Sequence, residues 1–100
     1  MNIVKKAEGS KLTVALEGRL DTTTAPVLEA ELKSALEGVT ELEFDLASLD
    51  YVSSAGLRVL LSAQKVMNRQ GKMLLRNVNQ EIMEIFDVTG FIYILDIEGA

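Results

Sequence analysis

Two adjacent serines, Ser53 and Ser54, carry the hydroxyl groups of this chain that are best placed for chemistry. They stand where an alternating segment gives way to a helical pattern, so they should lie at a helix N-terminus. Free N–H groups and the positive end of the helix dipole favour an anion there, which suits a hydroxyl that receives a phosphate. Plain helix capping by serine is the alternative interpretation.

The residues after the serines suggest a surface for a partner protein. Ala55 and Gly56 leave little bulk around the hydroxyls, so that another backbone can come close. The buried stripe of the helix is expected at Gly56, Val59, Leu60, Ala63, Val66, Met67 and Gln70. Leu57 and Leu61 then fall on an adjoining flank beside Arg58 and predict an anchor for a partner. A wide apolar face packed under another element is the alternative.

Other catalytic groups are largely missing from the sequence. The chain has no His and no Cys, which removes imidazole bases, thiol nucleophiles and the usual zinc ligands. Glu41, Glu43 and Asp45 share one face of an expected strand and could hold a hard cation, but a solvated strand face gives this pattern more often. Neither glycine-rich phosphate-binding motif is present. We therefore predict no catalytic residue, no metal site and no cofactor.

Length and composition predict a single domain over residues 1–100, with enough apolar content, 48%, to fill a core. The net charge of −5 argues against direct binding of nucleic acid, which needs clustered Lys and Arg. The N-terminus has no hydrophobic signal core, and no apolar run approaches the roughly 18 residues of a membrane span. We expect a cytoplasmic protein without a membrane span.

The pattern of alternating and helical segments predicts the order β-β-α-β-α-β-α-β. Strands are expected over residues 2–6, 12–18, 41–46, 72–76 and 91–95. The first helix should be capped by one of the threonines 22–24 and end at Gly38, and the second should end at Gly71. The third should be capped by Asn79 and end at Gly90.

This order predicts an α/β fold. The first two strands should form a hairpin, and the helical connections that follow imply parallel neighbours. The strand at 41–46 alternates strictly, so its sheet should have helices on one face and partial solvent on the other. The expected fold is therefore a two-layer sandwich, with a mixed sheet of about four to five strands and helices packed on one face.

The chain resembles a known family over nearly its whole length, and two segments carry the resemblance. The run Phe44-Asp45-Leu46-Ala47-Ser48-Leu49-Asp50-Tyr51-Val52-Ser53-Ser54-Ala55-Gly56-Leu57, preceded by Glu17-Gly18-Arg19-Leu20-Asp21, is similar to STAS domains, in particular bacterial anti-sigma factor antagonists. The resemblance implies a STAS-like sandwich. In the family, the second helix opens with the motif Asp-Ser-(Ser/Thr/Ala)-Gly-Leu. In the family, an anti-sigma factor serine kinase phosphorylates the first serine, which aligns with Ser54. Asp21 matches an acidic residue beside the phosphoserine loop.

The chain departs from the family pattern at two places. The aspartate before the phosphoserine is Ser53 here, so Ser53 is an alternative phosphoacceptor. Many members also carry a C-terminal helix after the last strand, and residues 96–100 are expected to be too short for one.

The resemblance implies a partner switch without enzymatic activity of its own. The unphosphorylated protein, a monomer or weak homodimer, would bind the kinase and release a sigma factor, and phosphorylation would end the complex until a PP2C-type phosphatase resets it. The expected partner-binding residues are Asp21, Thr22, Ser53, Ser54, Ala55, Gly56, Leu57, Arg58 and Leu61. The alternative is a STAS accessory or scaffold subunit of a lipid-transport or stress-signalling complex, in which the loop makes permanent contacts.

Overall fold

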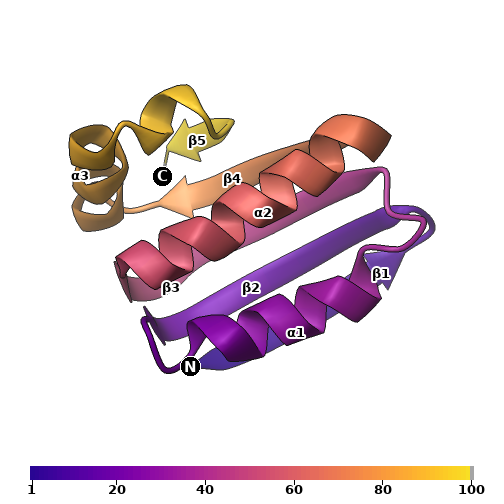
Figure 1. The fold of residues 1–100 in the computed structure, drawn as a ribbon, viewed down its shortest axis with the longest axis horizontal. Helices are drawn as coiled ribbons and strands as arrows, with labels where there is room; N and C mark the ends of the chain where they lie inside the picture. The colour runs from indigo at the N-terminus through magenta and orange to yellow at the C-terminus, as the bar shows by residue number, and fades with distance from the viewer. Residues whose placement is uncertain (100) are drawn as a thin grey trace.

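The computed structural model describes residues 1–99 and contains a mixed sheet with three α-helices (Figure 1). Its elements are β1 (Asn2–Glu8), β2 (Lys11–Leu20), α1 (Ala25–Ala35), β3 (Glu41–Val52), α2 (Ser54–Gln70), β4 (Lys72–Val78), α3 (Gln80–Thr89), the 3-10 helix η1 (Phe91–Tyr93) and β5 (Ile97–Gly99). The predicted α/β class and element order are confirmed. No helix within residues 1–99 is long and apolar enough to cross a membrane.

The sheet has the strand order β1-β2-β3-β4-β5. The hairpin β1–β2 is antiparallel, and each later pair is parallel, as the helical connections predicted. Helices α1 and α2 lie side by side over the same face of the sheet (Figure 1). The fold is therefore the expected two-layer sandwich.

Alternation along the central strands explains why only one face is covered by α1 and α2. Val14, Leu42 and Phe44 point into the core and have no exposed surface. Glu43 lies between two of them on the opposite face, where its carboxylate pairs with Arg76 at 3.1 Å and Lys11 at 3.8 Å. Ion pairs across neighbouring strands thus occupy a face that an apolar layer would otherwise have to cover.

The buried face of α2 is rotated from its predicted position. Leu57 was expected on an exposed flank, but it is only 4% exposed, whereas Val66, expected in the core, is 37% exposed. The reason is that α2 packs on both β3 and β4, which buries the Leu57 side of the helix. Val66 instead lines a cavity of about 330 Å³ between α1 and α2.

The predicted last strand at 91–95 is wrong. Gly90 adopts a left-handed conformation with φ 79° and ends α3, after which residues 91–93 form η1. Phe91 and Ile92 are half-buried against the core and Leu95 is buried, whereas Tyr93 is 88% exposed. This spacing of buried residues is that of a helix rather than of a strand. The final strand, β5, begins only at Ile97.

We predict that Leu57→Ala lowers the free energy of unfolding by about 2–5 kcal/mol, because it removes a buried side chain and leaves a cavity. Val66→Ala, in the same helix, should change it by no more than about 0.5 kcal/mol, since that side chain borders an open cavity. Urea unfolding of both variants measures the difference. Equal losses would contradict the rotated packing of α2.

Candidate functional site

The two candidate serines play different structural roles. Ser53 is the N-cap of α2, and its side-chain oxygen accepts a hydrogen bond from the Gly56 N–H at 3.2 Å. Ser54 is the first residue of the helix and is exposed. No acidic residue lies in the first turn, so the positive end of the dipole is not offset there. The Ser54 hydroxyl is thus the more accessible acceptor for a phosphate.

The loop before α2 is joined tightly to the end of β2. The Ser53 N–H donates to the Leu20 carbonyl at 2.8 Å. A Cβ atom on Gly56 would lie 2.7 Å from Leu20 Cγ and 2.9 Å from both the Leu20 carbonyl oxygen and Val52 Cγ2. Gly56 is therefore required by contacts within the chain. The expectation that it makes room for a partner is not supported, because Gly56 is buried.

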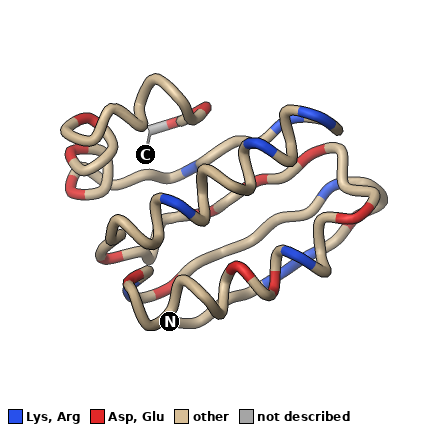
Figure 2. The backbone as a smooth tube through the Cα atoms, viewed as in Figure 1, with Lys and Arg blue, Asp and Glu red and all other residues tan. Residues whose placement is uncertain are grey.

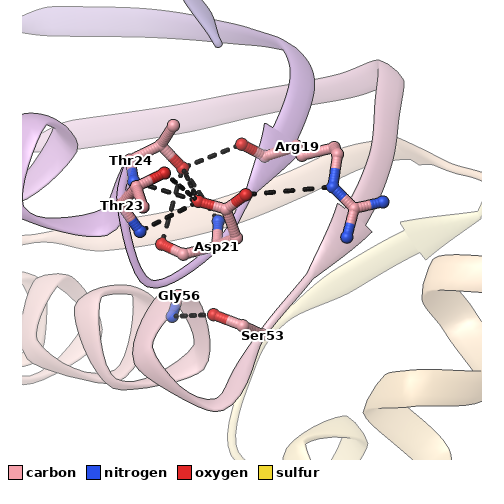
Figure 3. A network of polar contacts seen from close by, with 6 residues as sticks. All are labelled: Arg19, Asp21, Thr23, Thr24, Ser53 and Gly56. Carbon is pink, nitrogen blue, oxygen red and sulfur yellow. Dashed lines mark hydrogen bonds and ion pairs between the residues drawn. The ribbon is translucent and has the colours of Figure 1, made fainter.

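Asp21 organises the loop that follows β2 (Figure 3). Its Oδ1 atom accepts hydrogen bonds from the Thr23 N–H at 3.0 Å, the Thr23 hydroxyl at 2.7 Å and the Thr24 N–H at 3.1 Å. The Thr24 hydroxyl donates to the Arg19 carbonyl at 2.8 Å and accepts from the Asp21 N–H at 2.8 Å. Thr24 is the N-cap residue of α1, but its side chain makes no cap bond. The carboxylate, rather than a threonine, is thus the centre of this turn.

These bonds favour the ionised form of Asp21. The hydrogen bond from the Thr23 hydroxyl, followed by that from the Thr24 backbone, lowers the pKa of Asp21 from 3.8 to about 2. Arg19 Nε lies 3.8 Å from the carboxylate, and its guanidinium stacks over Tyr51 with 4.4 Å to the ring centroid. The site thus holds a negative charge at neutral pH, partly balanced by one cation.

The other predicted partner-binding residues divide into two groups. Thr22 and Arg58 are exposed, and Ala55 and Leu61 are half-buried, so these four are open to a partner to differing degrees. Leu57 is core and, like Gly56, presents little surface. The hydrogen bond between residues 53 and 20 brings the Asp21 loop beside the serines, although 32 positions separate them in the sequence.

Two asparagines support the serine loop from the β4 side, and the sequence patterns did not reveal this role. Pairing between β3 and β4 stops at Asp45 with Arg76, whereas β3 continues to Val52. Beyond that point Asn77 Nδ2 donates to Asp45 Oδ1 at 3.1 Å, and Asn79 Nδ2 donates to the Leu49 carbonyl at 2.9 Å. Side chains thus replace the missing backbone ladder beside the strand that leads to Ser53.

The backbone conformation of Asn77 also fits its role beside the end of β3. Its φ of 57° is the only positive value at a non-glycine residue within residues 1–99, and asparagine is one of the residues that tolerate this conformation. Asn79 also caps α3, because its Oδ1 accepts from the Ile82 N–H at 2.9 Å. The cap was predicted from the sequence, but the second bond needs the fold.

The sandwich and the serine loop together define a STAS domain. The family model described as "Mlab, STAS domain" matches residues 3–95. This chain belongs to the STAS domain family.

Its relatives include named regulators. The anti-sigma-B factor antagonist of Bacillus subtilis is 32% identical over 100 residues, covering 99% of this chain and 92% of the relative. The BtrV protein of Bordetella bronchiseptica is 38% identical over 91 residues, covering 89% and 78%. Among solved structures, the anti-sigma factor antagonist SpoIIAA in its unphosphorylated form aligns with a TM-score of 0.78 at 16% identity, over 99% of this chain and 89% of that one. This last likeness confirms the fold.

Asp21 should contribute a stabilisation that depends on pH. Its folded pKa of about 2 lies below the ordinary value of 3.8, so the stabilisation is present above about pH 4 and is lost as the pH falls through 2. NMR of the carboxyl carbon should give a midpoint near 2. Asp21→Asn should be less stable than the parent at pH 7, with the difference narrowing in acid. A difference independent of pH would contradict this role.

Gly56→Ala should lower the free energy of unfolding by about 1–3 kcal/mol, because the added methyl group overlaps Leu20 and Val52. Ser62→Ala, at an exposed position of the same helix, is the control and should change it little. Thermal unfolding of both variants provides the comparison. An unchanged melting temperature for Gly56→Ala would show that the two loops can separate without cost.

Proposed function

We propose that this protein is an anti-sigma factor antagonist that is regulated by phosphorylation of Ser54. Unphosphorylated, it binds a kinase-type anti-sigma factor through the serine loop and the exposed start of α2, and this binding releases a sigma factor. Phosphorylated, it leaves the kinase. The chain acts as a binding partner and phosphoacceptor rather than as an enzyme, and a PP2C-type phosphatase returns it to the binding state.

The observation that carries the proposal is the exposure of Ser54 at the N-terminus of α2, whose first turn contains no acidic residue. Two relatives of this chain in Bacillus and Listeria are named anti-sigma-B factor antagonists, which supports the class of partner. The structural neighbour SpoIIAA exists in a phosphorylated form, with a TM-score of 0.78. Ser53 is the less suitable acceptor because the residue is half-buried and its side-chain oxygen is engaged as the cap.

A phosphate on Ser54 should affect the complex more than the fold. Its charge of about −1.5 to −2 meets free N–H groups and the positive end of the dipole, so the helix tolerates it. A partner surface fitted to a small neutral hydroxyl must instead desolvate that charge. A carboxylate of the partner within about 6 Å would add roughly 3 kcal/mol per unit charge at an effective dielectric of about 20. Binding should therefore weaken by about a hundredfold or more.

Incubation with a cognate kinase and ATP, followed by mass spectrometry, tests the proposal. We expect a single phosphate on Ser54. A phosphate on Ser53 would move the site by one residue. No phosphate on either serine, together with a stable complex, would favour the scaffold role in which the loop makes permanent contacts.

Two substitutions should separate binding from modification. Ser54→Asp should lose about a hundredfold in affinity for the kinase without loss of thermal stability, whereas Ser54→Ala should bind and resist phosphorylation. Ser34→Asp, which adds the same charge at an exposed position of α1, is the control and should bind like the parent. Isothermal titration calorimetry gives the affinities. Equal losses for Ser34→Asp and Ser54→Asp would show that net charge, not the site, controls binding.

A further inference from the structure

The Lys and Arg side chains of this acidic protein differ in whether they form ion pairs. Six of its ten Lys and Arg residues form ion pairs within residues 1–99. Of the four that form none in that part of the chain, one is Lys33 on α1. The other three, Arg58, Lys65 and Arg69, all lie on α2 and are exposed.

Helix α2 also lacks any acidic residue over its 17 positions. In Figure 2 the charged residues along α2 are all blue and those along α3 are all red. The α3 residues are Glu81, Glu84 and Asp87, and none of them pairs with a cation of α2 within residues 1–99. Since the chain has 15 acidic residues and a net charge of −5, a helix with cations alone is a local departure from its composition.

The three cations form one line on the helix surface. At about 100° per residue, Arg58, Lys65 and Arg69 fall within roughly 40° of one another, directly opposite the buried face that contains Leu60 and Met67. They extend over about 16 Å along the axis. We call these three residues the basic stripe. It begins one turn after Ser54, so it continues the surface of the proposed acceptor site.

We propose that the basic stripe is the docking surface for an acidic face of the kinase-type partner, and that phosphate on Ser54 weakens docking by neutralising the stripe through Arg58. This inference rests on the proposed function and specifies the chemistry of its partner. The argument for an acidic partner is charge complementarity, because three cations on one face, none of them paired within residues 1–99, attract carboxylates and repel basic surfaces. The basic stripe begins next to Ser54, so a phosphate on Ser54 can change the attraction between the stripe and the partner.

The spacing of Ser54 and Arg58 gives the phosphate its route to the stripe. Residues four apart on a helix are neighbours, with about 5–6 Å between their Cβ atoms, and both of these side chains are exposed. A phosphoserine oxygen can therefore accept charge-assisted hydrogen bonds from the guanidinium of Arg58. The stripe carries three positive charges, and a phosphate of about −1.5 to −2 reduces this net charge to about +1 to +1.5. Phosphorylation thus removes most of the attraction without moving the backbone.

Association kinetics with the cognate kinase test the stripe. The triple variant Arg58→Gln, Lys65→Gln and Arg69→Gln should associate about tenfold or more slowly than the parent at low salt, because electrostatic steering is lost. The difference should largely disappear at about 1 M salt, where the Debye length is about 3 Å. Lys33→Gln removes from α1 an exposed cation that forms no ion pair in the described part of the chain, and it should match the parent. Equal effects of the triple variant and Lys33→Gln would overturn the inference.

The outcomes for the two proposals can be distinguished. If the parent is phosphorylated on Ser54 and binds the kinase, but the triple variant binds equally well at low salt, only the stripe is refuted. If the parent neither binds nor is phosphorylated, the proposed function fails and the stripe fails with it. Melting temperatures confirm that each variant is folded.

The phosphate step has its own test. Phosphoserine can be placed at position 54 by semisynthesis, and ³¹P NMR then follows the titration of the phosphate in the isolated protein. Pairing with Arg58 should add to the effect of the helix N-terminus and lower the second phosphate pKa below its ordinary value of about 6, and Arg58→Gln should raise it again. Lys33→Gln in the same phosphoprotein should leave it unchanged. Equal pKa values with and without Arg58 would remove Arg58 from the switch.

Two other ligands of a basic stripe are outcomes that would overturn the proposal. One is a membrane, which would appear as sedimentation with vesicles of phosphatidylserine and phosphatidylcholine that the triple variant loses and Lys33→Gln retains. The other is a second copy of this chain, whose α3 is acidic. Light scattering would then show self-association of the parent that the triple variant abolishes.

Discussion

The contact between Leu20 and Gly56 is the constraint on which the candidate site depends. The carbonyl of Leu20 accepts from the Ser53 N–H, and the space around it is so small that only a glycine fits at position 56. One backbone group thereby fixes where β2 ends and where α2 begins. Asp21 follows directly on one side of this contact and Ser54 lies on the other, so the relative position of charge and hydroxyl is set by backbone atoms rather than by mobile side chains.

Much of the fold follows from local patterns in the sequence. The alternation in residues 41–46 identified a strand with one buried face, and Asn79 and Gly90 marked the ends of α3 correctly. The errors arose where a neighbouring element decides the outcome. Leu57 is buried because α2 spans two strands, which the helical period alone does not show. Residues 91–95 are rich in β-forming side chains, yet Gly90 turns the chain so that η1 packs on the core.

The candidate site was predicted in part for the same reason. Ser53 and Ser54 could be placed at a helix start because capping is a local signal, and the family resemblance indicated Asp21. The roles of Gly56, Asn77 and Asn79 depend on atoms of other strands, namely Leu20, Asp45 and Leu49. Glycine and asparagine occur in many turns, so their types carry no information about such distant partners.

The strand order has a consequence for how the protein is made. Within residues 1–99 every strand pairs only with its neighbours in the chain, so the sheet can grow by one strand at a time as the polypeptide leaves the ribosome. The serine loop and its contact with Leu20 need only β2, β3 and α2, all of which precede residue 71. Asn77 and Asn79 emerge afterwards and fasten a loop that is already in place. A nascent chain could thus form the loop that carries the proposed acceptor serine before the last third of the domain has left the ribosome.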